Sequence, residues 1–274
     1  MIAMAITKRA SARRTVIQAA SAAIVNSGLP ALKACPFPGL NCYACPLASM
    51  ACPMGSLQNF LVLRRVPIAL VGLFAAVGGV VGRAVCGWAC PFGFIQDLLA
   101  RIGPRRKLLP TQKGSWMRYA MLILVALIAT YAVGAPLFCK ICPAGALEAG
   151  IPQVILRPGL RSLIGVLFWA KIVSLVLLVA AAILIKRPFC RFLCPLGAVY
   201  SPFNKVSLMR LEVDDTTCTR CDGCKRVCPV DLAVYEHPNS DSCIRCLECT
   251  RCPSVSVTWA HRSAPTSPVR TVEH

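Results

Sequence analysis

Long apolar stretches alternate with short polar and basic segments along the 274-residue chain. The stretch 66–82 carries no charge, 119–137 is rich in Leu, Ile, Val and Ala, and 162–185 is the longest of the three. At about 1.5 Å per residue, a helix over 162–185 is long enough to cross a bilayer core of about 30 Å. A fourth stretch, 15–32, is interrupted by polar residues and a proline, and it fits either a first helix or the apolar region of a signal peptide. The pattern predicts a membrane all-α bundle of about four transmembrane helices, and we favour an uncleaved first helix.

The composition agrees with a membrane protein. Hydrophobic residues make up 56% of the chain and the mean hydropathy is +0.63, which is too apolar for an ordinary soluble domain. The net charge of +19 would favour a nucleic-acid partner, but the Lys and Arg residues gather between the apolar stretches. Of these 30 residues, 23 lie before residue 15, in 83–118 or after residue 185, on one side of the predicted bundle. The positive-inside rule therefore places both termini in the cytoplasm of a multi-pass inner-membrane protein that is surrounded by lipid and binds no nucleic acid.

Eight of the 18 cysteines form two runs near the C-terminus. The runs are Cys218, Cys221, Cys224 and Cys228, followed by Pro, and Cys243, Cys246, Cys249 and Cys252, also followed by Pro. This spacing is typical of two-cluster bacterial ferredoxins, in which the fourth Cys of each run binds the other cluster. We therefore expect residues 205–258 to form a small α+β ferredoxin-like domain with two [4Fe–4S] clusters, structural zinc being the alternative. Only two residues separate Cys249 from Cys252, so Cys252 is the least regular of the eight ligands.

A short motif repeats in the remaining sequence. Cys-Pro-x-Gly occurs four times, each time beside the end of a predicted span, beginning at Cys52, Cys90, Cys142 and Cys194. Two copies end a Cys-x3-Cys-Pro motif on the predicted cytoplasmic face, formed by Cys86 with Cys90 and by Cys190 with Cys194. Residues four apart share one face of a helix, so two such pairs facing each other would supply four thiolates. We expect a further iron–sulfur cluster there, the alternative being thiols with a purely structural role.

The predicted outer loops hold a second group of cysteines. Cys42 and Cys45 form one Cys-x2-Cys pair, Cys139 and Cys142 form another, and Cys35 and Cys52 flank the first pair. These thiols could bind metal as ligands of a cluster, or they could form disulfides in an oxidising compartment. The sequence leaves both interpretations open.

Lys171 is the one charged residue inside a predicted span. It could hydrogen-bond the oxygen of a bound quinone, or its side chain could reach the membrane interface beside Trp169. All three histidines lie in the tail and there is no CxxCH, so no haem is expected in the bundle. Since there is no GxGxxG or Walker sequence either, another protein must bind any nucleotide or flavin donor.

These motifs are similar to those of one known family. Arg13-Arg14 before the first apolar stretch, the motifs ending at Cys90 and Cys194, and the tail ferredoxin resemble the NapH/NosR-type membrane polyferredoxins. The resemblance extends over most of the chain, from about residue 12 to residue 255. It implies a quinol-dehydrogenase membrane component that carries electrons between a quinol pool and a partner redox enzyme, rather than a self-contained enzyme. The outer Cys-x2-Cys pairs go beyond the simplest pattern of the family and indicate a subgroup with another partner.

The chain is thereby divided into a bundle over 1–204, a ferredoxin-like domain over 205–258, and a tail over 259–274 that we expect to be disordered. The leading functional prediction is an integral membrane iron–sulfur protein. It would pass electrons between a quinone pool or a cytoplasmic donor and a partner redox enzyme. Two other functions stay open: a thiol–disulfide relay that exports reducing equivalents through the outer pairs, and an iron–sulfur sensor or assembly factor without turnover.

Overall fold

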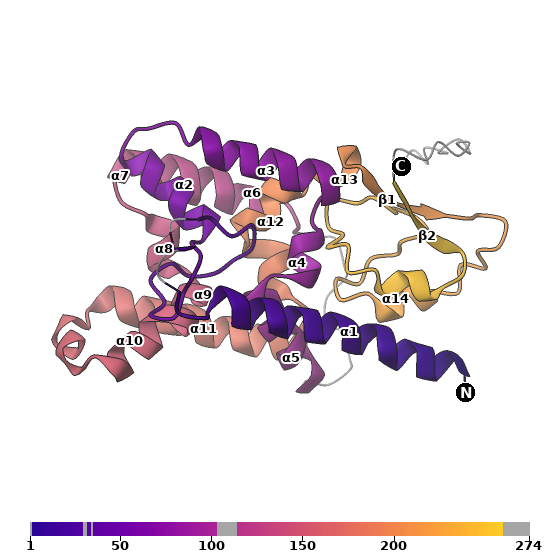
Figure 1. Ribbon diagram of the computed structural model, residues 1–274, viewed down its shortest axis with the longest axis horizontal. Coiled ribbons are helices and arrows are strands. Elements are labelled where there is room, and N and C mark those ends of the chain that lie inside the picture. Colours follow the sequence, from indigo (N-terminus) through magenta and orange to yellow (C-terminus); the bar gives the residue numbers. More distant parts are fainter. Residues whose placement is uncertain (1, 30–31, 34, 103–113, 260–274) are drawn as a thin grey trace.

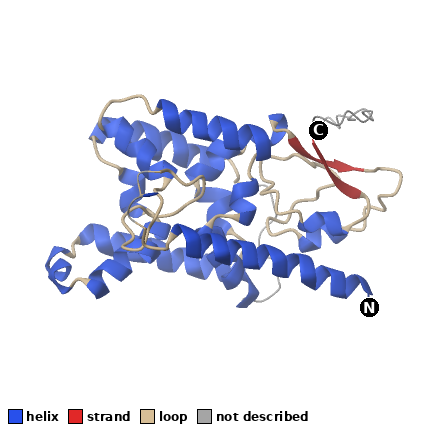
Figure 2. Cartoon of the chain, in the orientation of Figure 1, coloured by secondary structure: helices blue, strands red, loops and turns tan. Residues whose placement is uncertain are grey.

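The computed structural model describes residues 2–29, 32–33, 35–102 and 114–259. Helices form one end of the molecule, and a small domain with two strands forms the other (Figures 1 and 2). The predicted disordered tail, apart from Trp259, lies outside the described residues. The fold is mostly helical, as the apolar pattern predicts.

The helical part consists of many short elements and a few long ones. In chain order they are α1 (Ile2–Val25), α2 (Pro53–Val62), α3 (Ile68–Val81), α4 (Ala84–Trp88), α5 (Pro91–Ile102), α6 (Met117–Ala120), the π-helical η2 (Met121–Ala129), α7 (Thr130–Val133), α8 (Leu137–Ile141), α9 (Pro143–Gly145), the π-helical η3 (Ala146–Gly150), α10 (Ile151–Leu156), the 3-10 helix η4 (Pro158–Leu163), α11 (Val166–Leu184), the π-helical η5 (Phe189–Leu193), α12 (Pro195–Tyr200) and α13 (Phe203–Val206).

Only α11, with 19 residues, is long and apolar enough among the described helices to cross a membrane by itself. The apolar helix α3 has 14 residues, and the continuous run from α6 to α7 is also shorter than a span. α1 begins and ends earlier in the sequence than the predicted stretch 15–32. The described residues therefore provide one candidate span, and the bundle of four spans stays a prediction.

Each Cys-Pro-x-Gly motif starts a helix. Its proline is the first residue of α2, α5, α9 or α12. The cysteine before the proline is extended, with φ and ψ of −66° and 124° at Cys52, −65° and 120° at Cys142, and −73° and 110° at Cys194. The proline ring disfavours a helical residue before it, while its fixed φ suits the first helical position. The repeat therefore places four thiols in the same local position, immediately before a helix.

The small domain is built on β1 (Met209–Val213) and β2 (Val255–Trp259), which pair antiparallel with Leu211 opposite Val257. Between the strands, the chain forms the short helix α14 (Gly223–Val227) and the 3-10 turn η6 (Glu248–Arg251), which pack against each other. Leu211 and Val255 are buried beneath the sheet. The two cysteine runs lie in the connections around α14 and η6.

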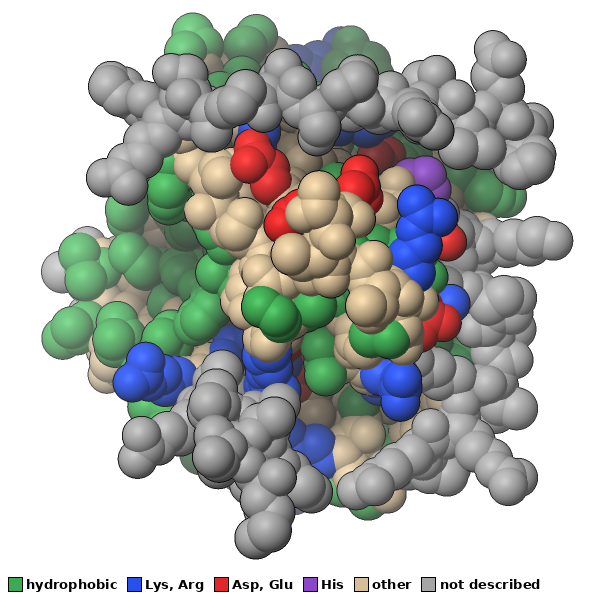
Figure 3. Space-filling model, turned by 90° about the vertical axis from the view of Figure 1, so that its right-hand side faces the viewer, with side chains coloured by type: hydrophobic (Ala, Val, Ile, Leu, Met, Phe, Trp, Pro, Cys, Tyr) green, Lys and Arg blue, Asp and Glu red, His purple; other side chains and the backbone are tan. Residues whose placement is uncertain are grey.

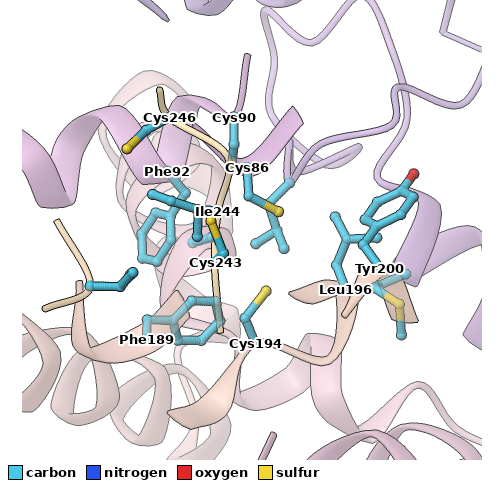
Figure 4. Packing of buried hydrophobic residues seen from close by; sticks show 14 of the residues in the cluster. Cys86, Cys90, Phe92, Phe189, Cys194, Leu196, Tyr200, Cys243, Ile244 and Cys246 are labelled. Atoms are coloured by element: carbon cyan, nitrogen blue, oxygen red, sulfur yellow. The ribbon is translucent and has the colours of Figure 1, made fainter. Parts of the chain in front are cut away.

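One continuous core joins the two ends of the molecule. Phe92 of α5 packs edge-on against Phe189 of η5, and the buried Ile244 of the second cysteine run lies in the same cluster (Figure 4). At Gly87 of α4 the two parts come so close that an added Cβ would lie 2.6 Å from the carbonyl oxygen of Ile244. The motif of Cys86 and Cys90 in the helical part is therefore in direct contact with the small domain.

Candidate iron–sulfur centres

The two tail runs have the same backbone shape. Positive φ angles occur at the second and fourth residues after the first cysteine of each run: 51° at Arg220, 57° at Asp222, 48° at Arg245 and 60° at Leu247. Left-handed residues that alternate with ordinary ones turn successive backbone N–H groups toward one point, and such concave loops bind anions and iron–sulfur clusters. Positive φ is unfavourable for these residue types, so it persists only where surrounding contacts hold it. The repeated pattern fits the loop of a cluster in both runs.

The second run gathers four thiols, three of its own and one from the first run. They belong to Cys243, Cys246, Cys249 and Cys228. Burial, together with the neighbouring thiols of the set, raises the pKa of Cys228 to about 12 and that of Cys243 to about 11. Thiols in this setting become ligands only where a metal ion supplies compensating positive charge. The set matches the crossed pattern expected of a two-cluster ferredoxin.

The other tail set, Cys218, Cys221, Cys224 and Cys252, lies nearer to solvent. Cys221 is exposed, and only Cys224 is buried. The backbone N–H of Gly223 donates to the Cys221 thiol and lowers its pKa. Since α14 and η6 pack together, the first run lies beside the end of the second, where Cys252 follows η6. The grouping of these four ligands, Cys252 included, stays a prediction.

The two Cys-x3-Cys-Pro motifs face each other. Their thiols, Cys86, Cys90, Cys190 and Cys194, lie within electrostatic range of one another. The sulfurs of Cys86 and Cys194 point into a common space (Figure 4). Gln96 Nε2 donates to Cys190 Sγ at 3.2 Å, and the backbone N–H of Gly197 donates to Cys194 Sγ at 3.3 Å. We call this four-cysteine group the inner site.

Two buried arginines, which were not predicted from the sequence, cross between the motifs. Arg83 Nη2 donates to the Cys190 carbonyl oxygen at 3.1 Å, while Arg187 Nη1 donates to the Cys86 carbonyl oxygen at 2.8 Å. Each arginine thus binds the first cysteine of the other motif. Both are almost fully buried, with exposed fractions of 1% and 0%. Burying a guanidinium is costly unless negative charge lies nearby, and cluster thiolates would supply that charge.

A signal for these arginines was present in the sequence. Arg83 stands three residues before Cys86, and Arg187 stands three residues before Cys190, so the motif is Arg-x2-Cys-x3-Cys-Pro in both copies. Arg187 also makes a two-oxygen ion pair with Asp97 of α5, with both distances 2.6 Å. Burial by itself would raise the pKa of Asp97, but Arg187 and its neighbours outweigh burial and lower it.

The third group includes Cys52, which belongs to neither of the predicted Cys-x2-Cys pairs and was expected only to flank one of them. The thiols of Cys42, Cys139 and Cys142 interact with that of Cys52. Cys45 lies in the same loop, and its backbone N–H donates to the carbonyl oxygen of Cys42 at 3.0 Å. Cys45 is not among the largest electrostatic influences on the other four thiols.

Lys171 lies beside this outer group. The position that a Cβ on Gly145 would occupy is 3.5 Å from Cys42 Sγ and 3.9 Å from Lys171 Nζ. The ammonium group therefore acts on the thiols of Cys42 and Cys139. Trp169, two residues earlier in α11, is exposed. The charge of Lys171 is directed toward sulfur within the protein.

The thiol groups have the donor set of an iron–sulfur cluster. All 18 cysteines are free, and a [4Fe–4S] cluster takes four thiolates. Across the described ranges, no three Cys, His, Asp or Glu side chains converge closely enough to hold one metal ion.

A mostly helical chain with repeated four-cysteine groups defines an iron–sulfur protein of the ferredoxin type. The family model described as a 4Fe-4S binding domain matches residues 63–110, 117–156 and 167–213. These segments include both motifs of the inner site and the pair Cys139 and Cys142.

Three relatives are informative. An uncharacterized protein of Methanocaldococcus jannaschii is 29% identical over 209 residues, which are 72% of this chain and 81% of the relative. The ferredoxin-type protein NapH of Haemophilus influenzae is 28% identical over 70% of this chain and 65% of its own length. The methylamine utilization ferredoxin-type protein MauN of Methylorubrum extorquens is 34% identical over 58% of this chain and 51% of its own length. No solved structure matches the chain.

The chain belongs to the NapH/NosR-type polyferredoxin family, as the sequence resemblance predicted. Its role is iron–sulfur electron transfer.

Proposed function

We propose that this chain is an integral membrane subunit that passes electrons between a quinone pool or a cytoplasmic donor and a partner redox enzyme. Two [4Fe–4S] clusters in the tail domain and one further cluster in the inner site would serve as one-electron carriers. The observation that carries the proposal is the contact between the inner site and the second tail run.

That contact joins the segment of Cys86 and Cys90 to the second tail run, and a cluster is proposed in both. Gly87, next to Cys86, is packed so closely that an added Cβ would lie 3.2 Å from the Cα of Cys246. Trp88 Nε1 donates to the carbonyl oxygen of Arg245 at 3.0 Å. Gly87 follows the predicted ligand Cys86, and Arg245 precedes the predicted ligand Cys246. Electrons held by the second tail run would therefore have the inner site as their immediate neighbour.

The buried charges suit such a carrier. The guanidinium groups of Arg83 and Arg187 lie against the inner-site backbone and compensate negative charge on four thiolates. Arg83 Nη1 also donates to the carbonyl oxygen of Asp241, just before the second run, so it links the two sites. Positive groups near a cluster favour its reduced, more negative state. The arrangement stabilises bound electrons while the backbone contacts keep the two sites together.

The surface supports a membrane setting. Large apolar side chains are exposed along α11, including Leu167, Val173 and Leu177. Exposed apolar surface on this scale is typical of contact with lipid. The end of the molecule that carries β1 and β2 presents acidic as well as basic side chains (Figure 3), as expected of a domain in water. A quinone is proposed on the family role alone, since Lys171 is directed toward thiols.

Anaerobic purification with iron quantitation tests the proposal. The tail should hold about eight irons and the inner site should add about four. Cys246→Ser should remove the signal of a tail cluster, and Cys86→Ser that of the inner site, in electron paramagnetic resonance. A quinol analogue should then reduce the clusters in proteoliposomes. Fewer than about four irons per chain, or zinc in their place, would end the proposal.

A further inference from the structure

The outer loops repeat the construction of the inner site. In both places two Cys-Pro-x-Gly motifs face each other, and the glycine N–H of each motif donates to the thiol of its own cysteine. Gly55 donates to Cys52 and Gly145 donates to Cys142. The sequence after Cys45 is Pro-Leu-Ala, so Cys45 lacks this glycine. The motif that builds the inner site therefore selects Cys52 rather than Cys45 in the outer loop.

The glycines also lie beside the sulfur of the opposite pair. A Cβ on Gly145, in the motif of Cys142, would lie 3.5 Å from Cys42 Sγ. A Cβ on Gly55, in the motif of Cys52, would lie 3.7 Å from Cys139 Sγ. Each motif thus receives a thiol that comes from the other half of the chain. The crossing therefore places a thiol from each half of the chain beside the motif of the other half.

We propose that Cys42, Cys52, Cys139 and Cys142 form a fourth iron–sulfur site, with Lys171 as its counter-charge and Cys45 outside it. The proposal rests on the electron-transfer function argued above and extends it toward the outer side of the protein. Lys171 Nζ lies 3.9 Å from the position of a Cβ on Gly145, and its charge acts on the thiols of Cys42 and Cys139. An ammonium group in an apolar helix requires a negative partner, and four thiolates around iron are net negative.

Two further contacts hold this site in place. Glu148 Oε2 accepts the backbone N–H of Cys42 at 2.6 Å, which fixes the first ligand. Gln58 Oε1 accepts the backbone N–H of Cys139 at 3.3 Å. Both side chains come from helices that the Cys-Pro-x-Gly motifs begin or precede.

The outer and inner sites adjoin. The backbone N–H of Leu40, two residues before Cys42, hydrogen-bonds to the thiol of Cys90. The outer loop therefore enters the protein as far as the inner site, which removes the long gap that a bilayer core of about 30 Å would impose. Transfer between them is a one-electron exchange in which no bond forms or breaks: the donor site is oxidised as the acceptor site is reduced. A one-electron redox protein at the outer face would complete the path.

Matched cysteine variants of the full chain, purified without oxygen, test the site. Cys52→Ser should lose about four irons and one paramagnetic signal, while Cys45→Ser should keep the wild-type iron content. Both cysteines are buried, precede a proline and lie in one loop, so they differ mainly in the proposed ligand role. Retention of the tail signals in Cys52→Ser shows that the variant is folded.

Lys171→Met gives a second measurement, and no cluster potential would change in it if the outer cysteines had only a structural role. It should retain all iron but lower the potential of one cluster, because a neighbouring positive charge is lost. Loss of iron in Cys45→Ser but not in Cys52→Ser would overturn the assignment. So would full iron in both variants, or a disulfide involving Cys52 in the native protein. Absence of iron from the wild type would instead refute the proposed function itself.

Discussion

Gly87 permits the contact between the inner site and the tail domain, and Gly87→Ala is the most direct perturbation of that contact. The added Cβ would lie 2.6 Å from the Ile244 carbonyl oxygen, where ordinary contact begins at 3.4 Å. It would also lie 3.2 Å from both the nitrogen and the Cα of Cys246. All three atoms belong to the backbone, so no side chain can turn aside to relieve the overlap.

The size of the effect follows from this geometry. A displacement of somewhat less than an ångström must be shared between α4 and the second cysteine run, and overpacking of this kind costs about 1–3 kcal/mol. Since about 1.4 kcal/mol is a tenfold change in an equilibrium constant, separation of the tail domain from α4 should become about 5- to 150-fold more frequent. The Trp88 hydrogen bond to Arg245 should weaken with it.

Amide hydrogen exchange around Ile244 measures that separation, and stopped-flow reduction of the inner site through the tail measures its functional consequence. Exchange should quicken and reduction should slow in Gly87→Ala. Gly72→Ala is the control, because a Cβ there meets nothing within 4 Å. If Gly87→Ala exchanged and transferred electrons at the rates of Gly72→Ala, the inferred contact between the two sites would be wrong.

Two other substitutions test the packing. Asp97→Asn removes the carboxylate that pairs with buried Arg187 and should cost about 3–5 kcal/mol, seen as a lower thermal midpoint in detergent; an unchanged midpoint would mean that the pair contributes no net stability. Gly78→Ala would place a Cβ 2.6 Å from the Phe203 ring, whereas Gly79→Ala meets open space. The first should lower the midpoint relative to the second, and equal midpoints would contradict the close approach of α3 to α13.

The apolar pattern located helices better than it defined spans. α3 and α11 lie inside the stretches 66–82 and 162–185. Both helices are shorter than these stretches because Gly and Pro at the ends favour turns over further helix. α1 was misplaced because a helix with mixed polar and apolar residues lacks a sharp apolar boundary. Hydropathy records composition along the chain, whereas helix ends depend on local backbone preferences.

The cysteine motifs could be interpreted from the sequence because the residues that form each motif are close neighbours along the chain. Cys-Pro-x-Gly shows the turn, the helix start and the thiol within four residues. The roles of Arg83 and Arg187 were missed because the count of basic residues treated them as solvated charges at the cytoplasmic face. Their partners lie more than 100 residues away along the chain, at Cys190 and Cys86. Long-range pairing of this kind requires the fold.

The side-chain contact of Gln96 leads to a prediction about the inner site alone. Gln96 Nε2 donates to Cys190 Sγ at 3.2 Å, and an N–H···S bond stabilises the more negative, reduced state of a cluster. Gln96→Leu removes this donor. If the bond contributes about 0.5–1.5 kcal/mol to the difference between the two states, the one-electron potential should fall by about 20–60 mV. A redox titration followed by paramagnetic resonance measures this shift, and the tail clusters in the same sample are the internal control. Equal falls in the potentials of all clusters would indicate a general loss of packing. An unchanged potential of the inner-site cluster would mean that the Cys190 sulfur is not a ligand of that cluster.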